Sequence, residues 1–496
     1  MFLAHHEKGL MIALALTVMY LFVAPAIIRI PVWLSNSYYP FGESVLMDSS
    51  GNLVDNPSNT LNSYHFWPWF IYFAGMFLQI TGLPNWVLLK YFPILIISLC
   101  ALLVYLTLRV KVKATHATLG AGLFLASFWL RQHYFGPPGL GYIFFLLGVL
   151  IISRLFFSKL EEKRSLAALF MFVFIATTLT HVLSAFMLVA VLIALYLAHR
   201  FARKQTPGNL SILCFFSATF FLAYNMFFAG PFFRLTVRTF SAIFSLSRGL
   251  GLFREPSRVA GSAAQVLNYR STIAIMLIIG GVALVGMLFV LKSRFSRKRT
   301  PIDTFSMFWA LFSVFLLLFA VGAEYGPHEA YQRAFMFGLV PLVYFCVIAL
   351  SRKTRLLSIV ILVLLFLNIP AQYGADSYTL ARGPILSGAY FFAFRTPQNV
   401  SCFYEFSLEI RYYNPQKEVK FVILAALPFT SVPNASEVNR ALNEADYVVI
   451  SDQQSNYYYY FLHQNPIDQV DLNRFNRLYD NDDFRVLRQA NATSLP

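Results

Sequence analysis

Two side chains of opposite charge stand four residues apart in the stretch AEYGPHEAYQRAF at 323–335. Glu329 and Arg333 have the spacing of one helix face, and Pro327 is typical of a helix start just before them. Arg333 would lie roughly one turn inside the apolar run that follows, where a charge is costly to keep. Such a guanidinium could hold a phosphate, with Glu329 orienting it and Glu324 nearby. An ion pair that only helps Arg333 tolerate burial is the alternative.

A second polar group, formed by Arg131, Gln132 and His133, ends another apolar run in WLRQHYFGPP at 129–138. The aromatic residues on either side of the triplet are typical of a helix end anchored at a membrane surface, and the Pro-Pro pair stops the helix. Such anchoring does not explain the polar triplet itself. We therefore interpret the triplet as the wall of a polar site. His181, in the turn THVLSAF, is a further polar residue between apolar runs. Neither histidine has partners at metal-ligand spacing, so the sequence predicts no metal site.

The stretch 31–64 contains acids but no Lys or Arg. A carboxylate held close to a bilayer could act as a general base. Glu43 is the preferred candidate and Asp48 the second. Most loop acids are merely solvated, and this is our interpretation of Asp55.

The stretch 230–271 has the opposite charge and includes FFRLTVRTFSAIFSLSRGLGLF. Arg234 and Arg238 would share one face of a helix whose other faces are apolar. The simpler interpretation is a helix that lies on anionic lipid headgroups. The more specific one is that it covers the bound phosphate of a lipid-linked substrate.

The composition shows what must surround these residues. Of the 496 residues, 58% are hydrophobic and 12% are charged, which is more apolar surface than a soluble core could bury. The net charge of +16 could indicate nucleic acid, but nearly half of the Lys and Arg residues lie in alternate short gaps between apolar runs. These are Lys8; Arg109, Lys111 and Lys113; Arg154, Lys159, Lys163 and Arg164; Arg200, Arg203 and Lys204; Lys292, Arg294, Arg297, Lys298 and Arg299; Arg352, Lys353 and Arg355. The positive-inside rule makes these gaps cytoplasmic and excludes nucleic acid as a partner.

Eleven apolar runs are long enough to be read as transmembrane helices. They are 10–30, 86–108, 117–133, 139–157, 165–180, 182–199, 209–229, 272–291, 304–322, 334–350 and 355–370. The N-terminus is then cytoplasmic, and the long external loops are 31–85 and 230–271. The apolar run 66–81 is short for a span, and counting it would reverse the side of the basic gaps, so we predict a helix lying in the outer interface.

Hydropathy falls from residue 371 onward, and the pattern changes to short strands and helices. Strands are predicted at 419–426 and 446–451, with a helix at 436–445 between them. We therefore divide the chain into a transmembrane domain, 1–370, and an external α/β domain, 371–496. The fold class is an α-helical polytopic membrane protein with a small C-terminal α/β domain.

Acids are almost absent from the apolar runs, which argues against a path for protons or ions through the bilayer. The polar residues gather instead at the outer ends of the predicted helices. The sequence thus predicts a site at the outer membrane surface, reached from lipid on one side and from the exterior on the other.

In the order of these features the chain resembles the GT-C class of polyprenyl-phosphate-dependent glycosyltransferases, in particular prokaryotic relatives of protein mannosyltransferases and of the aminoarabinose transferase of lipid A. The likeness covers most of the chain: a first span, a long external loop, YHFWPWFIYFAGMFLQITGLP as the interfacial helix, then RQHYFGPP, the THVLSAF turn and the late Glu-Arg turn. The segments DYVVISDQQSNYYYY and RLYDNDDFRVLR look like the end of such chains. The oligosaccharyltransferase branch is disfavoured, because the chain lacks that branch's W-W-D-type motif and its length.

The resemblance implies a hexosyltransferase type of enzyme in the plasma membrane. It would move a sugar from a polyprenyl (dolichyl-type) phosphate to a protein, glycan or lipid acceptor on the non-cytoplasmic face, with Arg333 and the basic loop holding the phosphate. No cofactor is firmly implied; a divalent metal is compatible with the resemblance, but nothing in the sequence indicates one.

One departure from the family concerns the base. Asn36 stands where the family's acid is expected just after the first span, and His133 stands where a second acid is common. Asn36 cannot accept a proton as a base, so either Glu43 or Asp48 supplies the carboxylate or the protein binds lipid-linked sugars without transferring them. A transporter or flippase is the remaining alternative, but the inverted repeats typical of transporters are not evident.

Overall fold

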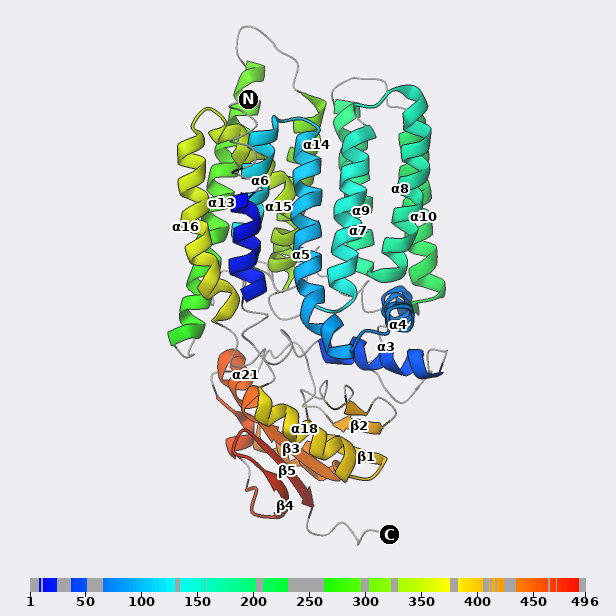
Figure 1. The fold of residues 1–496 in the computed structure, drawn as a ribbon, viewed down its shortest axis with the longest axis vertical. Coiled ribbons are helices and arrows are strands. Elements are labelled where there is room, and N and C mark those ends of the chain that lie inside the picture. Colours follow the sequence, from blue (N-terminus) through cyan, green and yellow to red (C-terminus); the bar gives the residue numbers. More distant parts are fainter. Residues whose placement is uncertain are drawn as a thin grey trace.

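The computed structural model describes most of the chain. The described residues are 9, 12–24, 37–50, 66–129, 134–155, 157–201, 208–230, 263–295, 303–322, 329–374, 382–404, 410, 413–414, 417–422, 434–462, 464–469 and 471–489. They form a bundle of long helices, a small α/β domain at one end of the bundle, and two short helices near the junction of these two bodies (Figure 1).

The apolar runs form helices because, in lipid, each backbone N–H and C=O group must be paired within its own segment. The bundle consists of η1 (Met19–Val23), α5 (Asn85–Arg109), α6 (Ala114–Ser127), α7 (Pro137–Leu155), α8 (Leu160–Thr180), α9 (Val182–Phe201), α10 (Gly208–Phe227), α13 (Ala263–Phe295), α14 (Thr304–Gly322), α15 (Glu329–Leu350) and α16 (Thr354–Tyr373). Among the described residues, eight helices are long and apolar enough to cross a bilayer: α5, α7 to α10, α13, α15 and α16. The other three predicted spans do not meet this criterion over their described residues. The predicted fold class, a polytopic helical membrane protein with a small C-terminal sheet, is confirmed.

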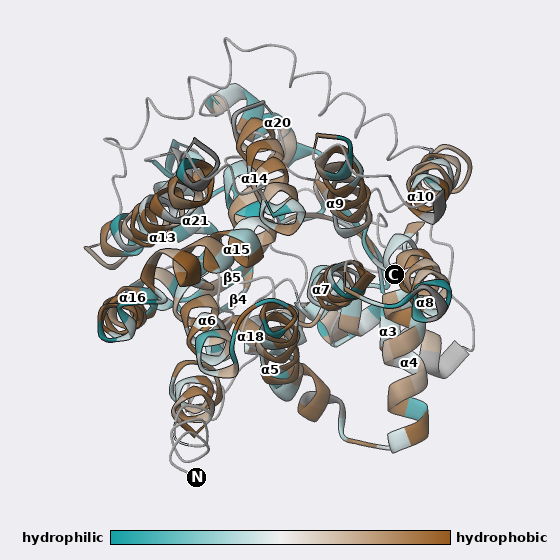
Figure 2. Cartoon of the chain, turned by 90° about the horizontal axis from the view of Figure 1, so that it is seen from above, coloured by the Kyte–Doolittle hydropathy of each residue, from teal (hydrophilic) through white to brown (hydrophobic). Residues whose placement is uncertain are grey.

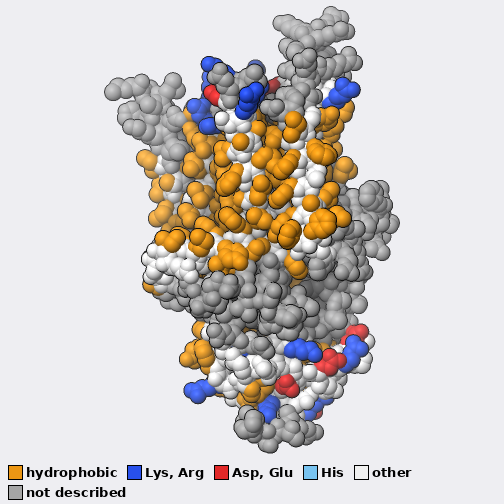
Figure 3. Space-filling model, turned by 90° about the vertical axis from the view of Figure 1, so that its right-hand side faces the viewer, with side chains coloured by type: hydrophobic (Ala, Val, Ile, Leu, Met, Phe, Trp, Pro, Cys, Tyr) orange, Lys and Arg blue, Asp and Glu red, His pale blue; other side chains and the backbone are white. Residues whose placement is uncertain are grey.

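The outside of the bundle is a continuous apolar surface (Figure 3). Large side chains such as Phe172, Phe215 and Leu277 are each about 70% exposed there, which suits contact with lipid and not with water. Lys and Arg side chains gather at the end of the bundle that is farthest from the α/β domain (Figure 3). The described Lys and Arg residues of the predicted cytoplasmic loops therefore lie at the same end of the bundle.

The structure corrects two predicted helix boundaries. The span predicted at 117–133 ends at Ser127, and Pro137 begins α7 instead of only stopping the helix before it. Proline suits this position because the first N–H groups of a helix have no partner within it. The span predicted at 272–291 begins at Ala263, so the loop predicted at 230–271 is nine residues shorter. At about 1.5 Å per residue, α13 is about 50 Å long and extends beyond the hydrocarbon layer.

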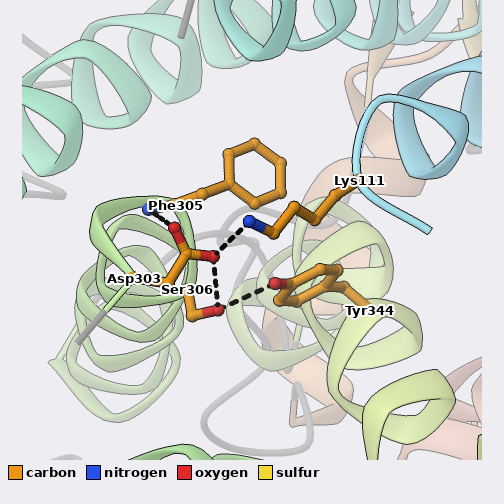
Figure 4. A network of polar contacts seen from close by, with 5 residues as sticks. All are labelled: Lys111, Asp303, Phe305, Ser306 and Tyr344. Atoms are coloured by element: carbon orange, nitrogen blue, oxygen red, sulfur yellow. Dashed lines mark hydrogen bonds and ion pairs between the residues drawn. The ribbon is translucent and has the colours of Figure 1, made fainter. Parts of the chain in front are cut away.

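A polar network holds helix ends together at the basic end of the bundle (Figure 4). Asp303, just before α14, accepts a hydrogen bond from the backbone N–H of Phe305 at 3.4 Å and forms an ion pair with Lys111 at 3.1 Å. The Ser306 hydroxyl lies 3.3 Å from the Asp303 carboxylate and 2.8 Å from the Tyr344 hydroxyl. The network thus joins the α5–α6 turn, the start of α14 and the last third of α15.

Two short helices, α3 (Tyr38–Ser50) and α4 (Trp69–Thr81), lie across the opposite end of the bundle (Figure 1). The spans are seen end-on in Figure 2, whereas α4 is seen along its length. One face of α4 is buried, and its other face exposes apolar side chains such as Met76 and Ile80. A helix is therefore present where the interfacial helix was predicted at 66–81, and its place in the outer interface of the membrane stays a prediction.

The C-terminal domain is built on one five-stranded sheet with the order β2-β1-β3-β5-β4. Its strands are β1 (Asn399–Phe403), β2 (Glu418–Val422), β3 (Tyr447–Ser451), β4 (Phe475–Asp480) and β5 (Phe484–Gln489). Strand β1 runs parallel to β2 and β3, while β5 runs antiparallel to β3 and β4. All five residues of β3 are buried, as expected for a central strand covered on both faces.

Helices cover both faces of this sheet. On one face α18 (Gly383–Arg395) packs on Tyr447, Val449 and Phe484. On the other face α20 (Ala435–Asn443) and α21 (Asp452–Leu462) pack on Val448 and Ile450. The first core also contains the first residue of α3, which joins the domain to the layer beneath the bundle. The strands predicted at 419–426 and 446–451 and the helix at 436–445 are present, although β2 ends at Val422; β1 and α18 were not predicted.

Candidate functional site

Arg333 lies in the second turn of α15, at the end of the bundle that faces the α/β domain. Its side chain is only 8% exposed. An arginine inside an apolar helix costs about 3 kcal/mol to insert, so its burial calls for a compensating negative or polar group. Glu329, the first residue of α15, stands one turn earlier on the same face.

His181 stands close to Arg333, in the extended turn between α8 and α9. Its Nδ1 atom accepts a hydrogen bond from the Ser184 backbone N–H at 3.3 Å and lies 2.9 Å from the Ser184 hydroxyl. Burial, and after it the positive charge of Arg333, lower the pKa of the imidazole to about 3. His181 is therefore neutral at physiological pH and carries its hydrogen on Nε2, which makes it a donor at this position.

The start of α7 fits tightly against the His181 turn. Gly141 has no room for a side chain, because a Cβ atom there would lie 2.5 Å from the Cβ atom of His181. One residue later, the hydroxyl of Tyr142 donates to the carbonyl of Met336 on α15 at 2.9 Å. These two contacts fix the distance between α7, His181 and the helix that carries Arg333.

Aromatic side chains hold the short helices α3 and α4 against the bundle. The ring of Phe135, just before α7, contacts Phe41 of α3, Phe70 of α4 and Phe92 of α5, with centroid distances of 5.6, 4.9 and 5.0 Å. This cluster is dry and well packed, so α3 is anchored over the outer end of the bundle.

Glu43 belongs to this anchored helix. Its side chain is 4% exposed, and it stands two residues after Phe41 in the sequence. Asp48 is also on α3, but its side chain lies outside the described residues. A buried carboxylate on an interfacial helix and a buried guanidinium at the outer end of α15 are thus placed in the same layer of the molecule, between the bundle and the α/β domain.

Two amides on α16 complete the layer, and the sequence did not single them out. Asn368 donates to the carbonyl of Ala126 at 3.0 Å, and Gln372 donates to the carbonyl of Phe128 at 2.8 Å. Both side chains are fully buried. Their signal in the sequence is a pair of amides four residues apart at the end of an apolar run, a spacing that puts both on one helix face.

Several residues predicted for the site lie outside the described residues. They are Asn36, Glu324, Arg131, Gln132, His133, Arg234 and Arg238, and the side chain of Glu329. The structure therefore brings together Arg333 and His181 and places Glu43 on α3. The roles of the others stay predictions. Within the described ranges, no three His, Cys, Asp or Glu side chains group as metal ligands.

The site can bind an anion at the lipid surface. Arg333 offers a positive charge and a planar set of donors, and the neutral His181 adds an uncharged donor beside it.

A scan against protein-family models finds no match, and a search of curated protein sequences finds none either. Solved structures do match. The oligosaccharyltransferase of Archaeoglobus fulgidus in its apo form is 12% identical with a TM-score of 0.57, over 98% of this chain and 75% of that one. Its complex with zinc and sulfate is 13% identical with a TM-score of 0.54, over 97% and 73%.

ArnT from Cupriavidus metallidurans, bound to undecaprenyl phosphate, is 11% identical over 99% of both chains, but its TM-score of 0.45 is too low to define the fold. The stronger likeness is to an oligosaccharyltransferase, the branch that the sequence disfavours. At such low identity the likeness concerns the fold and assigns neither donor nor acceptor. The chain shares its fold with the oligosaccharyltransferase of Archaeoglobus fulgidus.

Proposed function

We propose that this protein is a membrane glycosyltransferase that moves a sugar from a polyprenyl-phosphate carrier to an acceptor on the non-cytoplasmic face. The observation that carries the proposal is the burial of Arg333 beside a neutral His181 at the outer end of the bundle. A lipid-borne phosphate can reach this point from the bilayer, and an acceptor can reach it from the side of the α/β domain. The fold that the chain shares with an oligosaccharyltransferase supports the same reaction class.

The proposal gives each residue a role. Arg333 binds the phosphate that becomes the leaving group, and Glu329 orients the guanidinium. Glu43 removes a proton from the acceptor hydroxyl, whose oxygen attacks the anomeric carbon while the bond from that carbon to the phosphate oxygen breaks. Asp48 is the second candidate for the base. Arg234 and Arg238 extend the phosphate site over the headgroups.

The orientation in the membrane follows from the charge distribution. The basic end of the bundle faces the cytoplasm by the positive-inside rule, so the α/β domain is external. The acceptor, a protein, glycan or lipid, then meets the donor under this domain.

The test is transfer of radiolabelled sugar in proteoliposomes from a panel of polyprenyl-phosphate sugars. We expect Glu43→Gln to lower transfer by at least about 100-fold, because it removes the base and keeps the size of the side chain. Arg333→Ala should abolish transfer and weaken binding of the carrier. Glu444→Gln, an exposed acid just after α20, is the matched control and should behave as wild type.

Each remaining outcome has a defined meaning. If Asp48→Asn abolishes transfer and Glu43→Gln does not, Asp48 is the base. If wild-type protein transfers no sugar from any donor but binds the carriers in an Arg333-dependent manner, the enzyme proposal is wrong. The protein would then be a binding or transport protein for lipid-linked sugars.

A further inference from the structure

The α/β domain carries a sequence motif that the proposed reaction does not use. Asn-x-Ser/Thr, with any residue except proline in the middle, is the acceptor motif of N-glycosylation. The chain contains four such triplets, and three of them lie in the α/β domain: Asn209-Leu-Ser211, Asn399-Val-Ser401, Asn434-Ala-Ser436 and Asn491-Ala-Thr493. Such a triplet also arises by chance, so the structure around each asparagine decides whether it can be an acceptor.

Asn434 stands at the exposed start of a helix. It is the N-cap of α20, and both Asn434 and Ser436 are exposed. The side-chain oxygen of Asn434 accepts hydrogen bonds from the backbone N–H of Glu437 at 3.0 Å and from the hydroxyl of Ser436 at 2.6 Å. The carboxylate of Glu437 accepts in turn from the backbone N–H of Asn434 at 3.0 Å. These contacts form a capping box, which holds the start of α20 in place.

The cap uses the oxygen of the Asn434 amide and leaves the nitrogen available. Within the described residues, the amide nitrogen of Asn434 has no hydrogen-bond partner. N-glycosylation replaces one hydrogen on this nitrogen and leaves the carbonyl oxygen unchanged. A glycan on Asn434 therefore breaks no hydrogen bond of the cap, and α20 can stay folded beneath it.

Asn399 is also exposed, but its triplet belongs to the centre of the sheet. Strand β1 pairs with β2 on one side and with β3 on the other. The hydroxyl of Ser401 donates to the carboxylate of Asp446 at 2.7 Å and accepts from the backbone N–H of Asp446 at 2.8 Å. A transferase that reads this hydroxyl would have to open the sheet, whereas at Asn434 it has to loosen only the first turn of an exposed helix. Asn491 lies outside the described residues.

Asn209 carries the same motif at the other end of the molecule. It is the second residue of α10 and follows the basic segment that contains Arg200, Arg203 and Lys204. The positive-inside rule places this end in the cytoplasm and the α/β domain outside. N-glycosylation is a modification of secreted and external segments, so Asn209 should not be an acceptor. Among the described triplets, Asn434 alone combines an external position with a free amide nitrogen and an accessible hydroxyl.

We propose that this protein is itself N-glycosylated and that Asn434 is the modified residue. The partner is a separate membrane transferase that recognises Asn-x-Ser/Thr and uses an oligosaccharide linked to a lipid phosphate as the donor. The amide nitrogen forms a bond to the anomeric carbon while the bond from that carbon to the phosphate oxygen breaks. The lipid phosphate leaves with the electron pair, and the proton lost from the nitrogen passes to a base of the transferase. This modification requires the external orientation of the domain, but it does not depend on the reaction proposed for the protein.

The test is mass spectrometry of the protein purified from membranes of the organism that encodes it. Trypsin releases Asn434 in the peptide 421–440, which contains no other triplet of this kind. We expect this peptide to carry a glycan in wild type and in Ser436→Thr, which keeps the motif, and to lose it completely in Ser436→Ala. Asn434→Asp should also lose the glycan, and its melting temperature shows that α20 is intact, because aspartate is an equally good N-cap.

Asn209→Asp is the matched control, because it removes the same motif at the basic end and should leave the glycan mass of the protein unchanged. An unmodified peptide 421–440 in wild type would overturn the proposal. A glycan on this peptide that survives Ser436→Ala would also overturn it, because the modification would not follow the motif. A glycan on Asn209 would refute the orientation and the proposal together. Labelling of the domain from outside on intact cells separates these cases, since an external domain without a glycan refutes the modification alone and leaves the proposed function standing.

Discussion

Gly141 is the residue at which the site tolerates the least added volume. Its missing Cβ atom would overlap the Cβ atom of His181 at 2.5 Å, and neither atom is at the end of a flexible chain. We predict that Gly141→Ala displaces the His181 turn and lowers sugar transfer about 10- to 100-fold, the usual result of moving a binding group by about 1 Å. The measurement is transfer in proteoliposomes, with protein amount in the membrane held equal.

A second glycine provides the control for this prediction. Gly280, in the middle of α13, has open space around the position of a Cβ atom. Gly280→Ala should keep full activity and raise the melting temperature slightly, because alanine is the better helix former by up to about 1 kcal/mol. Full activity of Gly141→Ala would show that the His181 turn can move without consequence for the site.

At the residue scale, the sequence identified the charged members of the site better than the uncharged ones. Arg333 stands out because an arginine in an apolar run is expensive, and the structure places it beside His181. Asn368 and Gln372 did not stand out, because an amide carries no charge and so is less conspicuous in an apolar run than an arginine. Their partners, Ala126 and Phe128, are more than 240 residues earlier in the chain, so no local pattern could reveal them.

At the scale of single elements, the same two amides explain why one predicted span was wrong. The apolar pattern continues to residue 133, yet α6 ends at Ser127, where α16 supplies donors for its last carbonyls. The span predicted at 304–322 agrees with α14, which begins directly after a local N-cap, Asp303. Helix ends set by neighbours in the sequence were therefore predictable, and those set by a distant helix were not.

The start of α14 can be tested by separating the two roles of Asp303. The ion pair with Lys111 is more than one third exposed on both sides and should contribute less than about 1 kcal/mol. The N-cap hydrogen bond to Phe305 should contribute about 1 kcal/mol. We predict that Asp303→Ala lowers the melting temperature in detergent clearly, whereas Asp303→Asn, which keeps an acceptor oxygen, and Lys111→Ala change it little. Equal losses for Asp303→Asn and Asp303→Ala would show that the charge matters more than the cap.

At the scale of the whole molecule, the helix bundle, which contacts lipid, and the α/β domain, which contacts water, meet at the candidate site. The bundle exposes apolar side chains to lipid, and the α/β domain exposes charged ones to water (Figure 3). Helix α3 joins the two, because Tyr38 is buried in the core beneath α18 while Phe41 packs on the bundle. Glu43 follows these two anchors on the same helix, so a motion of the domain against the bundle would move the proposed base.

The orientation of the protein in the membrane can be tested, because the α/β domain and the basic end of the bundle should lie on opposite sides. Three native cysteines are buried and Cys214 is half-buried in α10, so a cysteine introduced at an exposed position can be followed with a membrane-impermeant maleimide. We predict that Leu478→Cys, in β4 of the domain, is labelled on intact cells. Lys353→Cys, in the exposed turn before α16, should be labelled only after the cells are permeabilised. The reverse pattern would place the basic end outside and the site on the cytoplasmic face, where a lipid-linked donor would have to be used before it crosses the membrane.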